Sequence, residues 1–167
     1  MSGDVAVRCV GCGALFPESD GPVHRYMDSS PGCWAAYGEV LAREYGDPEY
    51  GRVHRLTVDA YAAQHPGRAS AQAVRSVAFH LVRLCLVLER GFDMRRAADA
   101  MKAVAARKDA YRWLAPPASL GEATVADVLR ARNAGEHVAA VEAWARTVWL
   151  AWSCHHDTVR AWASELL

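Results

Sequence analysis

Three cysteines near the N-terminus have the spacing of metal ligands. Cys9 and Cys12 form a Cys-Val-Gly-Cys pair, and 20 residues separate Cys12 from Cys33. Two thiolates at this spacing can chelate one tetrahedral ion, and the glycine permits a tight turn between them. His24 lies between the cysteines, which gives the pattern Cys-x2-Cys-x11-His-x8-Cys. The pattern predicts a zinc site held by the three cysteines and by His24, with His65 or a water molecule as alternatives for the fourth position.

The segment that carries these ligands cannot order itself by apolar burial. Residues 1–32 contain five glycines and three prolines but few large apolar side chains. Zinc would supply ordering energy on the order of 10 kcal/mol for a structural site. Unligated thiols in a flexible tail and a redox pair are the alternatives. The redox alternative is weaker, because a thioredoxin-like pair opens a helix directly after a strand, whereas glycines and Pro17 surround this one.

The histidines farther along the chain form the second group of chemically interesting residues. His65 stands at a predicted helix end, His80 borders an apolar stripe, and His155 lies inside one, next to His156. A polar group in an apolar stripe needs a hydrogen-bond partner. One interpretation gives each imidazole its own structural partner. The other brings them together across helices as a metal site or an acid–base pair.

If the histidines share one site, Tyr61 is a further catalytic candidate, and Trp149 and Arg83 would line the pocket. Tyr61 precedes His65 by four residues and therefore meets it on the helix surface. Trp149 would form part of the wall, and Arg83 could hold an acidic group of a small anionic ligand. The candidate catalytic residues are His65, His80, His155, His156 and Tyr61.

The elements that must position these residues are helices. Apolar residues recur at intervals of three and four, no period-two pattern is found, and the chain has no isoleucine. We expect an all-α helical bundle over residues 33–167, preceded by an irregular zinc-binding N-terminal cap, residues 1–32. Glycine, proline and capping residues place the predicted helices at residues 33–46, 48–65, 70–91, 94–108, 124–132 and 136–167.

Composition narrows the functional classes. The chain has 167 residues, with 19 basic and 19 acidic side chains and 52% apolar residues. This composition indicates a folded domain, and the absence of an excess of positive charge argues against a nucleic-acid partner. Frequent charges predict no membrane span, and the N-terminus lacks the apolar core of a secretory signal. Five cysteines without a signal argue against a disulfide framework, so we expect a cytoplasmic protein in which Cys85 and Cys154 are buried.

Several segments resemble a bacterial family of small cytosolic proteins that is known only as a domain of unknown function. The resemblance rests on CVGCGALFPESDGPVHRYMDSSPGCWAAYGEVLAREY, HRLTVDAYAAQHPG, VAFHLVRLCLVLERG and WARTVWLAWSCHHDTVRAWA. It covers nearly the whole chain and implies no activity, substrate or catalytic residue.

Two functions follow from the sequence. The first is a binding or interaction module with a structural zinc site, whose partner is a protein or a small anionic molecule. The second is a small metal-dependent enzyme with a histidine-lined pocket between helices. The sequence has no HExxH, Walker, GxSxG or GxGxxG motif. The choice depends on whether the histidines converge.

Overall fold

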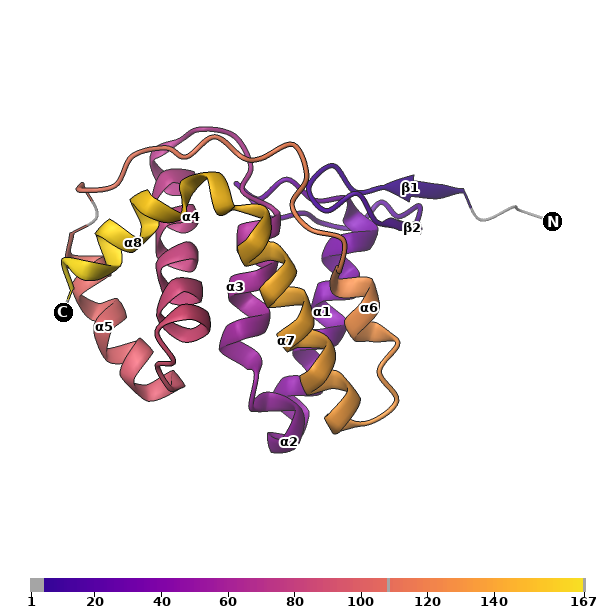
Figure 1. Ribbon diagram of the computed structural model, residues 1–167. Coiled ribbons are helices and arrows are strands. Elements are labelled where there is room, and N and C mark those ends of the chain that lie inside the picture. Colours follow the sequence, from indigo (N-terminus) through magenta and orange to yellow (C-terminus); the bar gives the residue numbers. More distant parts are fainter. Residues whose placement is uncertain (1–4, 108, 167) are drawn as a thin grey trace.

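The computed structural model of the protein describes residues 5–107 and 109–166. Figure 1 shows a helical bundle with a small two-stranded hairpin at one end. The expected all-α class is confirmed. The elements are β1 (Ala6–Arg8), β2 (Leu15–Pro17), α1 (Pro31–Gly46), α2 (Pro48–Gly51), α3 (His54–Gln64), α4 (Ala71–Leu84), α5 (Met94–Ala106), α6 (Val125–Leu129), α7 (Ala134–Ala151) and α8 (His156–Ser164).

Helix α3 lies at the centre of the bundle. It packs against α4 on one side and α7 on the other (Figure 1). Eight of its 11 residues are buried, including the polar side chains of Thr57, Asp59 and Gln64. A polar group in such a place must be paired. Gln64 accepts a hydrogen bond from the indole N–H of Trp144 at 2.9 Å and donates to the carbonyl of Ala123 at 2.8 Å.

Three predicted helices are interrupted. The segment 48–65 divides into α2 and α3 after Gly51, and the segment 70–91 changes from α-helix to a π-helical turn at Cys85–Glu89. The predicted helix 136–167 breaks at a 3₁₀ turn, Ser153–His155, so that α8 leaves the axis of α7 and packs against α4. Periodicity continues across such a break and therefore cannot reveal it.

The break changes two expectations. His155 was expected inside an apolar stripe, but it is only partly buried and its Nε2 bonds the carbonyl of Ala115 at 2.8 Å. Cys154 was expected to be buried and is exposed, whereas Cys85 is buried as predicted. Both residues lie in the 3₁₀ turn, where the periodicity of an uninterrupted helix no longer predicts burial.

Helix α4 and the π-helical turn after it form an apolar stretch, Ala71–Glu89, that by length and composition alone could cross a membrane. Half of that stretch is buried inside the fold, where α4 packs against α3 and α8. Core helices commonly have this composition.

The expected division of the chain into an N-terminal cap, residues 1–32, and a helical bundle, residues 33–167, stays a prediction.

Candidate metal centre

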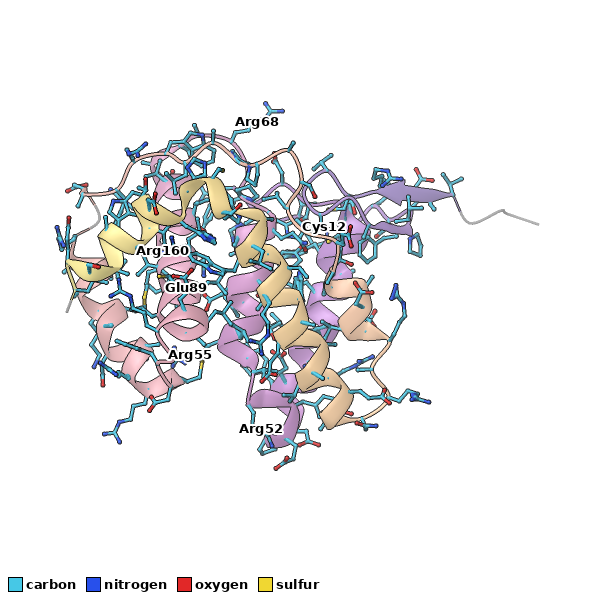
Figure 2. All side chains as sticks on the ribbon, viewed as in Figure 1. Cys12, Arg52, Arg55, Arg68, Glu89 and Arg160 are labelled. Atoms are coloured by element: carbon cyan, nitrogen blue, oxygen red, sulfur yellow. The ribbon has the colours of Figure 1, made fainter. Side chains whose placement is uncertain are left out.

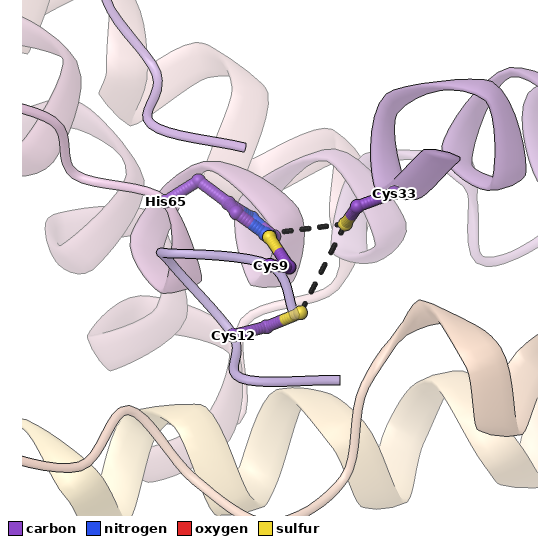
Figure 3. A group of neighbouring side chains, drawn as sticks. All are labelled: Cys9, Cys12, Cys33 and His65. Carbon is purple, nitrogen blue, oxygen red and sulfur yellow. Dashed lines mark hydrogen bonds between the residues drawn. The ribbon is translucent and has the colours of Figure 1, made fainter. Parts of the chain in front are cut away.

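Four side chains from three separate parts of the chain meet at one point. They are Cys9, Cys12, Cys33 and His65, and their ligand atoms all lie within 4.8 Å of one another. Figure 3 shows the two hairpin cysteines facing Cys33, which lies in α1, and His65, which directly follows α3. Cys9, Cys33 and His65 are buried, and Cys12 is partly exposed. In the described part of the chain this is the one such Cys/His/Asp/Glu cluster.

The first two cysteines are held by the turn that joins β1 to β2. The strands pair antiparallel, with Val7 opposite Phe16. At the turn, the Cys9 amide donates to the carbonyl of Ala14 at 2.8 Å, and the Gly13 amide donates to the carbonyl of Cys9 at 2.9 Å. Gly13 has a φ of +74°, a conformation that other residues rarely adopt. The turn therefore directs both sulfurs to the same side.

Gly11, inside the Cys-Val-Gly-Cys pair, has a separate role. A Cβ atom at this position would lie 2.4 Å from Cδ2 of His65 and 2.5 Å from the carbonyl oxygen of Asp28. These distances are shorter than any ordinary nonbonded contact. The glycine therefore allows the turn to lie directly against the imidazole ring.

The third cysteine stands in the first turn of α1. Ser30 caps this helix, since its hydroxyl accepts a hydrogen bond from the Cys33 amide at 3.2 Å. The Ser30 amide in turn donates to the sulfur of Cys9 at 3.4 Å. One short segment thus positions Cys33 and also stabilises negative charge on Cys9.

His65 follows the last residue of α3, where Pro66 prevents the helix from continuing. Its Nδ1 lies 2.7 Å from the carbonyl oxygen of Tyr61 and must donate to it, because a carbonyl only accepts. The other ring nitrogen, Nε2, lies 3.5 Å from the sulfur of Cys9 and 3.4 Å from that of Cys33, where it could bind a metal ion. Metal-binding histidines are commonly oriented through their other nitrogen in this way.

Tyr61 supports the cluster from α3. Its ring stacks on His65 with the centroids 4.0 Å apart, and its hydroxyl oxygen lies 3.5 Å from the sulfur of Cys33. Burial and the neighbouring Cys33 raise the pKa of this phenol, so it stays protonated and can donate to a thiolate. Tyr61 was a candidate catalytic residue; in the structure it positions the cluster.

The three thiols cannot all ionise without a counter-charge. Hydrogen bonds from Cys12 and Cys33 lower the pKa of the Cys9 thiol. The pKa of the Cys33 thiol is raised by its contacts with Cys12 and Cys9 and by burial. The structure therefore favours one thiolate alone and opposes three close together. A divalent cation at the centre would remove that opposition, so the arrangement can hold a metal ion.

His24, the expected fourth ligand, does not join the cluster. It is partly buried, and its ring contacts Tyr26 edge-on and lies 5.3 Å from Trp34. Its Nδ1 accepts a hydrogen bond from the Tyr26 amide at 3.4 Å. The alternative, His65, occupies the position instead. Sequence spacing favoured His24 because it lies between the cysteines, whereas folding brings the end of α3 to the cluster.

The remaining histidine candidates do not converge. His80 Nδ1 lies 2.7 Å from a carboxylate oxygen of Asp59, and His156 donates to the carbonyl of Trp149 at 2.8 Å and stacks on its indole. His155 bonds Ala115, as described above. Among the described residues, each imidazole therefore has its own partner, and the shared histidine site is not formed.

Two largely buried polar networks were not anticipated. Arg83, expected to face an anionic ligand, makes two hydrogen bonds to Asp59, at 2.6 and 2.5 Å. Glu44 is bound by His54 and His137 at 2.8 and 2.9 Å. The pattern of apolar residues along the helices does not predict partners for Asp59 and Glu44. Their partners lie on neighbouring helices and are seen only in the folded structure.

Comparison with known proteins gives a family but no activity. The model of DUF5946, a family of unknown function, matches residues 7–153, and the chain therefore belongs to this family. No curated protein and no solved structure matches the chain significantly.

Proposed function

We propose that the protein is a zinc-binding helical module in which a structural zinc ion, held by Cys9, Cys12, Cys33 and His65, fixes the N-terminal cap to the helical core. The observation that carries the proposal is the convergence of one imidazole nitrogen and three sulfurs from β1–β2, α1 and α3. Four protein ligands close a tetrahedral site, which is the pattern of structural zinc rather than catalytic zinc.

The spacing of the atoms fits zinc. Tetrahedral bonds of about 2.3 Å to sulfur and about 2.0 Å to nitrogen separate two sulfurs by about 3.8 Å, and a sulfur from a nitrogen by about 3.5 Å. The sulfurs of Cys12 and Cys33 are 3.9 Å apart, and the two sulfur–nitrogen distances to His65 are 3.4 and 3.5 Å. Soft thiolates with one imidazole also suit zinc better than magnesium or calcium. Reduced cysteines of this kind are consistent with a cytoplasmic protein.

A pair of histidine variants tests the ligand set. Purified wild-type protein should contain one zinc ion per chain, and cobalt(II) in its place should show the visible absorption of a tetrahedral thiolate site. His65→Ala should lose most of the zinc at a chelator concentration that the wild type withstands. His24→Ala, the matched control, should retain it, because His24 contacts only aromatic rings and a backbone amide. Equal retention by both variants, or selective loss from His24→Ala, would contradict the proposal.

The interaction role rests on what the N-terminal cap exposes. Most of the large apolar side chains that are exposed in the described residues lie on this cap; they are Val5, Val10, Leu15 and Val23, against Tyr45 and Leu150 elsewhere. Exposed apolar groups gathered on one small element favour contact with a partner protein. Zinc would then serve to hold this surface in shape.

A photoreactive residue at Val10 tests this role inside cells. Val10 is 77% exposed on the cap, and Leu150 on α7 is 64% exposed, so the same label at Leu150 is a matched control. A discrete protein adduct should form from position 10 and not from position 150, and it should disappear when Cys12 is replaced by serine. Equal labelling from both positions, or none from position 10, would refute the interaction role.

A further inference from the structure

A second site, distinct from the metal centre, lies between α4 and α5. The structure contains a cavity of about 400 Å³ there, a size typical of small-molecule pockets. Its walls include the aromatic rings of Tyr26, Phe79 and Tyr111, together with Arg75 and His80. None of its lining residues is an aspartate or a glutamate. The cavity therefore combines an apolar, aromatic interior with one guanidinium group and one imidazole ring.

His80 is held in one orientation by a buried ion pair. Arg83 makes two hydrogen bonds to the carboxylate of Asp59, and His80 Nδ1 lies 2.7 Å from the same carboxylate. The carboxylate side chain is fully buried, and it accepts hydrogen bonds, so Nδ1 carries the proton. The ring is thus fixed by one nitrogen, and the other, Nε2, is left for a different partner.

Nothing in the described part of the chain bonds that second nitrogen. Nε2 of His80 has no hydrogen-bond partner there, and it is not among the fully buried polar atoms that lack one. Because His80 lines the cavity and its side chain remains 13% exposed, Nε2 is open to the cavity. An imidazole oriented by a buried carboxylate and open at its other nitrogen is a prepared ligand contact.

Arg75 is the one arginine that lines the cavity. Arg75 has only a loose ion pair, 3.5 Å from Asp109, whose side chain is 86% exposed. Such a pair is easily exchanged for a better anion. Two smaller hollows share Tyr26 with the cavity; Arg25 lines both of them, and Arg68 and Asp28 line one. Figure 2 shows Arg68 at the end of the bundle where α4 begins, which is also the positive end of that helix dipole.

We propose that this cavity binds a small organic anion with an aromatic body. The aromatic walls would take the ring, Arg75 would hold the anionic group, and Nε2 of His80 would accept a hydrogen bond from a donor group of the ligand. A carboxylate and a phosphate share the required chemistry, because both accept paired hydrogen bonds from a guanidinium group. The proposal also gives a role to His80. This residue bonds an Asp59 carboxylate that Arg83 already pairs, and it lines the cavity.

Three probe molecules test the site on the full-length, metal-loaded protein. Benzoate and phenyl phosphate carry the two anionic groups, and benzamide is the neutral counterpart of benzoate. Nitrogen-15 NMR of the histidine side chains reports directly on Nε2 of His80, assigned by its absence in His80→Gln. We expect benzoate or phenyl phosphate to shift this resonance saturably and benzamide to bind at least about tenfold more weakly, as the loss of a charge-assisted hydrogen bond predicts. The anion that binds more tightly identifies the ligand class.

Charge variants complete the test. Arg75→Gln should weaken binding of the anion about tenfold or more, for the same reason. Arg55→Gln should leave binding unchanged, because Arg55 is exposed and lies toward the opposite end of the bundle from Arg68 (Figure 2). Both positions are exposed, so neither variant should disturb folding. The proposal would be overturned if neither anion shifted the His80 resonance, or if benzamide bound as tightly as the anions. It would also be overturned if Arg55→Gln weakened anion binding as much as Arg75→Gln.

Discussion

Gly11→Ala is the substitution for which the structure gives the clearest expectation. The added methyl group would lie 2.4 Å from Cδ2 of His65 and 2.5 Å from the carbonyl oxygen of Asp28, against 3.4 Å or more for an ordinary contact. The turn must therefore move by about 1 Å relative to α3, and Cys9 and Cys12 move with it. Overpacking of this kind costs about 1–3 kcal/mol. At about 2–4 °C per kcal/mol for a chain of this size, Tm should fall by about 2–12 °C.

A second alanine substitution supplies a control of opposite sign. Gly38 lies on the exposed side of α1, and a Cβ atom there meets nothing within 4 Å. Gly38→Ala should therefore raise the free energy of unfolding by about 0.5–1 kcal/mol, because alanine costs less entropy in a helix.

Thermal unfolding and zinc competition with a chelator, measured side by side, check this prediction. Gly11→Ala should lower both Tm and zinc affinity, whereas Gly38→Ala should raise Tm and leave zinc affinity unchanged. If Gly11→Ala kept the wild-type Tm and zinc affinity, the close approach of the turn to the imidazole, and the ligand set built on it, would be refuted.

Three further outcomes are expected. Asp59→Asn should lower the free energy of unfolding in urea by about 3–5 kcal/mol, because it leaves Arg83 buried without a counter-charge; a loss below about 1 kcal/mol would contradict the buried pair. Hydrogen bonds from Arg160 lower the pKa of Glu89 below its ordinary value of 4.5 (Figure 2). The stabilisation that this ion pair gives to the fold is therefore complete above pH 4.5 and is lost as the pH falls. Glu89→Gln should make the fall in stability below pH 4.5 shallower, and an unchanged acid profile would contradict this prediction. Cys154→Ser should change neither Tm nor zinc content, because this thiol is exposed and outside the cluster, and a loss of zinc would be the contrary result.

Much of the metal centre could be predicted from local sequence. The Cys-Val-Gly-Cys pair specifies a tight turn through its glycines, and Cys33 follows a helix-capping serine and a proline, so both halves are determined by neighbours in the chain. The fourth ligand could not be chosen, because His24 and His65 are both compatible with the spacing. The Pro66-Gly67 pair predicts that His65 lies at a helix end. No local pattern predicts which helix end lies beside the hairpin that carries Cys9 and Cys12.

The helical class, the three cysteines of the candidate cluster and most helix ends could be predicted from the sequence alone, because they depend on residues a few positions apart and on periodicity along one helix. The tertiary structure decided which histidine meets the cysteines, which carboxylates are buried in ion pairs, and where the last helix breaks. Each of these depends on contacts between distant segments: His65 lies 56 residues from Cys9, and Arg83 lies 24 residues from Asp59. Such pairs form only when neighbouring helices enclose α3. Burial removes water as a hydrogen-bond partner, so each buried polar group must bond another group of the protein.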